Sequence, residues 1–253
     1  MVVSFQSLAQ TPDTVFLEEL TWTEVRAAID SGATTVIVPT AGTEQNGPHM
    51  ALGKHKYRIN AGSDRIAREL GNALVAPVMT YVPEGNIDPP SGHMRYAGAI
   101  SLPQDVFRSV LEYAARSMRA HGFTDILFIG DSGGNQSGMR AVAETLNDEW
   151  NAERTRVLVV TDWYGADDYP NWLLSQGFSD EEIGSHAGLS DTAKLLYVAP
   201  QHVRTELLVD GDLANVEGVS GDPSKATAEL GKVGMDFHHE SAMRQINQLM
   251  AED

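Results

Sequence analysis

Cysteine is absent from the 253 residues, which excludes disulfide bonds, thiolate metal ligands and a cysteine nucleophile. Basic residues are also few: Lys and Arg number 18 against 35 Asp and Glu, which gives a formal net charge of −17. This charge repels phosphate backbones and anionic lipid, so nucleic acid is not an expected partner. No apolar run reaches the roughly 20 residues that a membrane-spanning helix needs, so no membrane partner is expected either.

The rest of the composition is that of an ordinary globular protein, with 42% hydrophobic and 21% charged residues. A chain of this length fits one large α/β domain, and no internal repeat or charged linker divides it. We therefore expect a single domain over residues 1–253, with residues 1–15 as an N-terminal tail. Residues 1–10 lack the basic start of a signal peptide, which favours a cytoplasmic location; a periplasmic one would follow if they are the remnant of such a peptide.

Short apolar runs alternate with amphipathic stretches along the chain. Four runs are almost continuously apolar, as is typical of parallel strands buried on both faces: 35–39, 73–81, 125–129 and 156–161. The amphipathic stretches predict helices over 22–29, 57–70, 103–121, 136–150, 192–198 and 234–250. Thr21 and Glu24 form a candidate capping box at the first helix. This alternation predicts an α/β fold of three layers, a mainly parallel sheet flanked by helices.

Polar loops follow the predicted strands, at the end where parallel sheets carry their functional groups. The first loop, residues 41–55, contains Glu44, Asn46, His49 and His55. Carboxylate and imidazole donors on a rigid backbone suit a zinc or manganese ion. The same residues also fit a purely structural interpretation, in which Glu44 caps a turn and the histidines are hydrogen-bonded at the surface.

A second polar loop, GDSGGNQSG at residues 130–138, contains the string that surrounds the nucleophilic serine of trypsin-like proteases. That fold is all-β, whereas here the string joins a predicted strand to a predicted helix, so a trypsin-like fold is excluded. Its glycines instead permit close approach of the backbone, and amides at a helix start suit an oxyanion or a carboxylate. Asp131 and Ser132 would then face the same crevice as Glu44; a plain helix cap is the simpler alternative.

A further polar cluster, SHAGLSDTA at residues 185–193, offers His186 for proton transfer and Asp191 either as a metal carboxylate or as a helix start. Trp163, after the fourth strand, is compatible with a pocket wall and equally with the core. Glu84 is expected to be surface charge. His238–Glu240 resembles a set of metal ligands, but neighbouring side chains on a helix point about 100° apart and do not easily share one ion, so a solvated stretch is expected there.

Five motifs in this order resemble the creatininase (creatinine amidohydrolase) family. They are Thr43–Gly53, His93–Leu102, Gly133–Asn135, His186–Thr192 and Gly218–Lys232. The resemblance covers most of the chain, from Thr35 to about Lys232. It implies a layered α/β fold, a metal centre that is usually binuclear, and hydrolysis of amide bonds in small cyclic or formamide-like substrates. It also implies homo-oligomers, often hexamers, and places His93 at the family's pocket.

The chain departs from the family pattern at four positions. Asn46 stands where the family has a histidine, and His55 stands where it has the aspartate that bridges two metals. Ser132 replaces a second histidine, and Asp191 replaces a glutamate. Imidazole rarely bridges two metals as carboxylate does, so one ion, zinc or manganese, is favoured over two. We expect Glu44, His55 and a further acid, Asp191 or Asp131, to hold this ion, with water in an open fourth position.

The expected activity is metal-dependent cleavage of a C–N amide bond in a small molecule. His186 would pass a proton to the leaving nitrogen, and Asn46 with the amides of Gly133–Asn135 would stabilise the oxyanion. The expected substrate contacts are Asn46, His93, Asn135 and Trp163. Two alternatives stay open: a metal-free serine hydrolase or lactonase with Ser132 as nucleophile and His186 as base, and a non-catalytic protein that binds a small molecule on the same fold.

Overall fold

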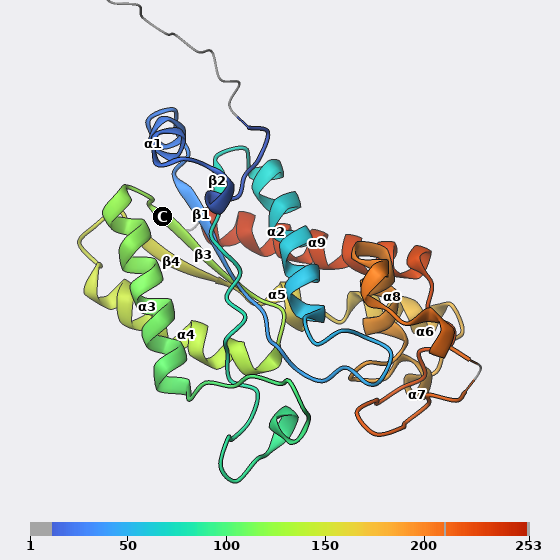
Figure 1. The fold of residues 1–253 in the computed structure, drawn as a ribbon. Helices are drawn as coiled ribbons and strands as arrows, with labels where there is room; N and C mark the ends of the chain where they lie inside the picture. The colour runs from blue at the N-terminus through green and yellow to red at the C-terminus, as the bar shows by residue number, and fades with distance from the viewer. Residues whose placement is uncertain (1–11, 210, 252–253) are drawn as a thin grey trace, which may run out of the picture.

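The computed structural model describes residues 12–209 and 211–251, and a four-stranded sheet lies at the centre of this part of the chain (Figure 1). Its strands are β1 (Thr35–Thr40), β2 (Ala73–Val75), β3 (Asp125–Gly130) and β4 (Arg156–Val160). They lie in the order β2-β1-β3-β4, and every neighbouring pair is parallel. The predicted parallel sheet is therefore confirmed, and the carboxyl ends of β1 and β3 lie side by side at its centre.

Helices cover both faces of the sheet, which gives the three predicted layers. Val36 and Val38 of β1 pack on one face, against α1 (Trp22–Asp30), α3 (Gln104–His121) and α4 (Gly133–Glu149). Ile37 points to the other face, where α2 (Lys54–Leu70) and α9 (Ala228–Ala251) pack (Figure 1). The continuous apolar runs of the strands follow from this burial on both sides.

The remaining elements join β4 to α9 and extend the molecule beyond the sheet. They are α5 (Asp162–Gly165), α6 (Asp168–Ser175), α7 (Asp180–Ile183), α8 (Leu189–Val198) and the 3-10 turns Pro200–His202 and Thr205–Leu207. Two earlier 3-10 turns are η1 (Leu17–Glu19) and η2 (Gly92–Arg95). Helix α8 packs closely on α9, because a Cβ at Gly231 would lie 1.8 Å from the carbonyl oxygen of Ala193. None of the described helices is long and apolar enough to cross a membrane.

Several element boundaries differ from the sequence predictions. The predicted strand 73–81 is regular only to Val75, because Pro77 has no N–H for a ladder. Helices α2, α4, α8 and α9 begin three to six residues earlier than predicted. The capping box of Thr21 and Glu24 is present. Of the predicted tail, residues 1–11 lie outside the described residues, whereas Val15 accepts a hydrogen bond from Val75 N–H and so belongs to the fold.

Candidate functional site

A cavity of about 520 Å³ opens beyond the carboxyl ends of β1 and β3. Its wall is built from the loop after β1, the first turns of α2, the loop before η2, the start of α4 and the segment that leads into α8. The polar residues that line it include Glu44, Lys54, His55, Arg58, Glu84, His93, Ser132, His186, Asp191, Lys194 and His238. Three separate polar stretches of the sequence therefore meet at one site, as expected for loops at the carboxyl edge of a parallel sheet.

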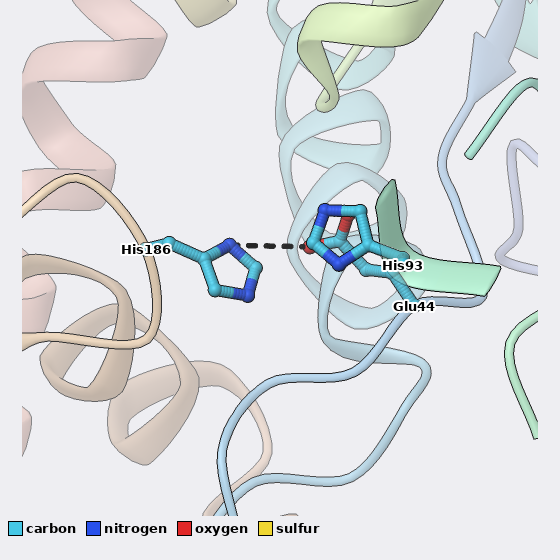
Figure 2. Close-up of side chains that lie close together, drawn as sticks. All are labelled: Glu44, His93 and His186. Carbon is cyan, nitrogen blue, oxygen red and sulfur yellow. Dashed lines mark ion pairs between the residues drawn. The ribbon is translucent and has the colours of Figure 1, made fainter. Parts of the chain in front are cut away.

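Glu44, His93 and His186 turn their side chains toward one another on this wall (Figure 2). One ligand atom from each lies within 4.8 Å of the other two. His93 Nε2 is 3.3 Å from Glu44 Oε2, and His186 Nδ1 is 3.7 Å from Glu44 Oε1. His186 Nε2 lies 2.9 Å from the carbonyl oxygen of Gln45 and donates to it, so the lone pair on Nδ1 faces Glu44.

These three residues fit a divalent metal ion. One carboxylate and two imidazoles form a donor set of catalytic zinc sites, which keep a fourth position open. Burial lowers the pKa of His93 and of His186, so both rings are neutral at pH 7, the form that binds metals. The hydrogen bond from His186 to a backbone carbonyl is the contact that usually orients a metal-binding histidine. The sequence prediction had given these two histidines other roles, as a substrate contact and a proton donor.

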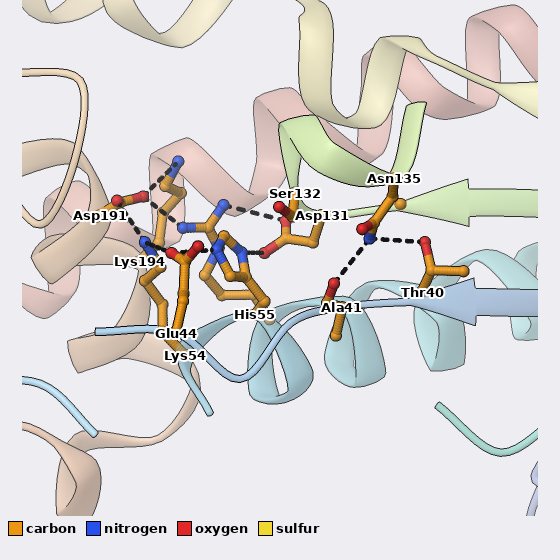
Figure 3. A network of polar contacts seen from close by, with 12 residues as sticks. Thr40, Ala41, Glu44, Lys54, His55, Asp131, Ser132, Asn135, Asp191 and Lys194 are labelled. Carbon is orange, nitrogen blue, oxygen red and sulfur yellow. Dashed lines mark hydrogen bonds and ion pairs between the residues drawn. The ribbon is translucent and has the colours of Figure 1, made fainter. Parts of the chain in front are cut away.

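His55 lies between two buried carboxylates and contacts both (Figure 3). Its Nε2 is 2.7 Å from Glu44 Oε1, and its Nδ1 is 2.7 Å from Asp131 Oδ2. Burial and the charge of Lys54 oppose protonation of the ring, but Glu44 and Asp131 outweigh them and raise the pKa of His55. The side chains of Glu44 and His55 therefore meet, and a hydrogen bond joins them.

Two further cations, Lys54 and Arg58, complete this network from the first turns of α2. Lys54 Nζ lies 3.2 Å from Glu44 Oε1 and 2.8 Å from Asp191 Oδ2. Arg58 spans the other pair, with Nη2 3.0 Å from Asp131 Oδ1 and Nη1 2.5 Å from Asp191 Oδ1. The two side chains share a helix face because they are four residues apart. Sequence reasoning missed both: Lys54 precedes residue 57, where the helix was predicted to start, and Arg58 lay inside the predicted helix without an assigned role.

Three of the predicted metal ligands already have partners in these ion pairs. Both ring nitrogens of His55 are engaged, and Asp131 and Asp191 are each held by Arg58. Metal binding by His55, Asp131 and Asp191 stays a prediction, and each would have to exchange an existing partner for the ion. Of the predicted ligands, only Glu44 lies in the cluster with His93 and His186.

The network predicts that acid destabilises the fold. Burial alone would raise the pKa values of Glu44, Asp131 and Asp191, but His55, Lys54 and Arg58 outweigh burial and lower all three. The stabilisation is present above the ordinary values, 4.5 for Glu and 3.8 for Asp, and is lost progressively as the pH falls below them toward the lowered pKa values of the folded protein. Urea unfolding at pH 7, 5, 4 and 3 should show the free energy of unfolding falling by roughly 1 kcal/mol or more per pH unit below pH 4. A flat profile there would contradict the ion pairs.

Glu84 is buried on the cavity wall, 6% exposed, which corrects the expectation of surface charge. It comes close to the chain after β1 because residue 42 is glycine; a Cβ there would lie 2.0 Å from Glu84 Oε1. Burial and the charge of Glu44 raise the pKa of Glu84 to about 9, so this carboxyl keeps its proton at pH 7. The sequence around it gave no sign of burial, since the contact depends on a distant glycine.

Three predicted substrate contacts lie behind the cavity wall rather than on it. Asn46 donates to the carbonyl oxygens of Glu44 and Ala51 and thereby fixes the first loop. The side chains of the other two are also fully buried: Asn135 donates to Thr40 and Ala41, and Trp163 donates to Asp131. His93 and the start of α4 at Ser132–Gly134 do line the cavity.

The expectation of a solvated stretch at His238–Glu240 is wrong for its two histidines, which are buried against the interior. His238 Nδ1 donates to the carbonyl oxygen of Trp163, and its Nε2 lies 3.1 Å from Lys194 Nζ on the cavity wall. His239 Nε2 is 2.7 Å from Glu69 Oε2. The helix was predicted correctly, but its burial follows from α5 and α8, which are distant in sequence.

Comparison with known proteins decides the family. The protein-family model described as creatinine amidohydrolase (creatininase) matches residues 18–246, almost the whole described chain. The chain belongs to the creatininase family. Among curated proteins, the chain is 27% identical over 220 residues to the mycofactocin precursor peptide peptidase of Mycolicibacterium smegmatis, covering 78% of each chain. It is 26% identical over 208 residues to the creatinine amidohydrolase of Pseudomonas putida, covering 78% of this chain and 76% of that one.

Solved creatininase structures share the fold. A crystal structure of creatinine amidohydrolase superposes with a TM-score of 0.78 at 21% identity, covering 94% of this chain and 98% of the other. A manganese form of creatininase gives a TM-score of 0.76 at 21% identity, covering 93% and 98%. The resemblance deduced from the five motifs is thereby confirmed, and with it the layered α/β architecture.

Two of the four departures from the family pattern, His55 and Asp191, lie in the ion network of this creatininase-family chain. His55 joins two carboxylates, and Asp191 pairs with Lys54 and Arg58. Ser132 occupies the N-cap position of α4 without a capping hydrogen bond from its side chain, and its hydroxyl makes no hydrogen bond with an imidazole of the described residues. The number of metal ions and the oligomeric state stay predictions.

Proposed function

We propose that this protein is a metal-dependent hydrolase that cleaves a C–N amide bond in a small substrate. The observation that carries the proposal is the cluster of Glu44, His93 and His186 in the cavity at the carboxyl edge of the sheet. Family membership supports it. The names of the two relatives above describe hydrolysis of a peptide in one case and of the small cyclic amide creatinine in the other. An amide C–N bond is what these substrates share.

The residues of the cavity suit this reaction. A divalent ion held by Glu44, His93 and His186 would lower the pKa of a water molecule and polarise the substrate carbonyl. The amides of Gly133 and Gly134 lie in the first turn of α4, where N–H groups have no intrahelical acceptor. They can therefore donate to a developing oxyanion. His186 would bind the ion through Nδ1. Proton transfer to the leaving nitrogen is the alternative role for the same ring.

The geometry gives less support to a serine nucleophile. A serine hydroxyl needs a base within hydrogen-bonding reach to become nucleophilic. Within residues 12–209 and 211–251, Ser132 has no such contact with His186 or another imidazole, although both line the cavity. His186 instead directs its two nitrogens toward Gln45 and Glu44. The metal-dependent reaction is therefore the better supported of the two.

Metal analysis and chelation test the proposal. The purified protein should hold close to one equivalent of zinc or manganese by elemental analysis, and chelation should abolish its hydrolysis of a panel of creatinine, small lactams, N-acetyl amino acids and dipeptides. Adding back Mn²⁺ or Zn²⁺ should restore it. The variant His186→Ala should lose the ion, whereas His121→Ala, at the exposed end of α3, should retain it. Hydrolysis that survives chelation, or a protein that binds neither ion, would overturn the proposal.

A further inference from the structure

Lys194 is a buried cation on the cavity wall whose nearest carboxylate is too distant for a hydrogen bond. It lies on α8, and its side chain is 6% exposed. The nearest carboxylate oxygen, Asp191 Oδ1, is 3.9 Å from Nζ, beyond hydrogen-bonding distance. Both oxygens of Asp191 already have closer partners: Oδ1 pairs with Arg58, and Oδ2 accepts from Lys54 and from the Ala187 amide.

The contacts of Lys194 leave donors unused. An ammonium has three N–H donors. His238 Nδ1 donates to the Trp163 carbonyl, so its Nε2 is an acceptor and takes one of them at 3.1 Å. The ring of Tyr169, 5.6 Å from Nζ, provides a cation–π contact but no lone pair. The other donors are therefore available to a molecule in the cavity, which Lys194 lines.

Charge balance indicates what that molecule carries. The three carboxylates of Glu44, Asp131 and Asp191 are matched by three cations, Lys54, His55 and Arg58. Lys194, when protonated, is then one positive charge in excess within the described wall of the cavity. A carboxylate on the entering molecule would compensate it, and the divalent ion proposed at Glu44, His93 and His186 adds positive charge to the cavity and so favours an anionic molecule further.

We propose that the cavity takes an amide substrate with a free carboxylate group, such as an N-acyl amino acid or the C-terminal residue of a peptide, and that Lys194 binds this carboxylate. That the bound molecule is a substrate rests on the proposed amide hydrolysis, but binding of its carboxylate by Lys194 does not. Burial and the charge of Arg58 lower the pKa of Lys194 to about 7, which agrees with a cation that lacks a close anion until one enters.

Binding of two matched compounds tests the inference. N-acetylalanine and N-acetylalaninamide differ in the carboxylate alone, and calorimetric titration of the purified protein gives the affinity for each. We expect the acid to bind about tenfold or more tightly than the amide. The variant Lys194→Met should abolish this preference, and Lys194→Arg should retain part of it. Lys56→Met, which removes one exposed positive charge from α2, should leave it unchanged.

The possible outcomes separate the two proposals. Equal binding of acid and amide, no binding of either, or a preference that survives in folded Lys194→Met would each overturn the role of Lys194. Circular dichroism shows whether that variant is folded, and Lys194→Arg keeps the question answerable if it is not. A preference for the acid in a protein that hydrolyses none of the panel would sustain the carboxylate site and reject the hydrolase. Metal-dependent hydrolysis without the preference would sustain the hydrolase and reject the carboxylate site.

Discussion

Replacing Arg58 with methionine should lower the free energy of unfolding by about 3–5 kcal/mol. Arg58 is 3% exposed and is the only partner that contacts both Asp131 and Asp191 in the described structure. Methionine fills a similar volume without charge, so the buried carboxylate of Asp131 and the half-buried carboxylate of Asp191 both lose a cation. Urea unfolding at pH 7 measures the loss, and the melting temperature should fall by roughly 10 °C.

Arg65→Met is a matched control on the same helix. Arg65 also pairs with an aspartate, Asp236, but the two side chains are 48% and 30% exposed. An ion pair in water contributes about 0–1 kcal/mol, so this variant should unfold close to the parent. Arg58→Lys should fall between the two, because an ammonium cannot span both aspartates. Equal losses in Arg58→Met and Arg65→Met would show that the buried network contributes no more to stability than a surface pair.

The fold could be predicted from the sequence because the patterns that determine each strand and helix are local. In the run of residues 125–129 every residue after Asp125 is apolar, and the structure buries alternate side chains of β3 on opposite faces of the sheet. The helices were found from their apolar periodicity, which is also local. Their starts were missed where the first turn is polar, as at Lys54 and Gly133, because a polar turn facing a buried network has the same pattern as a loop.

The site was predicted only in part because its contacts are not local. The loops that carry Glu44, Asp131 and His186 were identified, since each follows a strand or belongs to a motif of the family. Which of their side chains meet could not be deduced. The pairing of His93 with His186 depends on how two loops fold over the sheet, and the burial of Glu84 depends on Gly42. The charges that engage Asp191 come from Lys54, before the predicted start of its helix, and from Arg58, whose burial the local pattern does not indicate.

Replacing Glu44 with glutamine should weaken metal binding by more than about 100-fold and reduce hydrolysis with it. Removing an outer contact of a metal site already lowers affinity about 10–100-fold, and Glu44 is the one carboxylate of the proposed ligand set. The fold should tolerate the change better than the loss of Arg58, because Lys54 keeps Asp191 and His55 keeps Asp131. Zn²⁺ titration with a competing chromophoric chelator measures the affinity, alongside kcat/KM for the substrate found in the panel.

Glu69→Gln provides the comparison. Glu69 also contacts an imidazole, that of His239, but its side chain is 54% exposed and lies outside the cavity. Its loss should change zinc affinity less than about twofold. If Glu44→Gln bound zinc as tightly as Glu69→Gln, the cluster of Glu44, His93 and His186 would not be the metal site. The ion would then have to enter the network at His55, Asp131 and Asp191, and His55→Ala rather than Glu44→Gln should abolish binding.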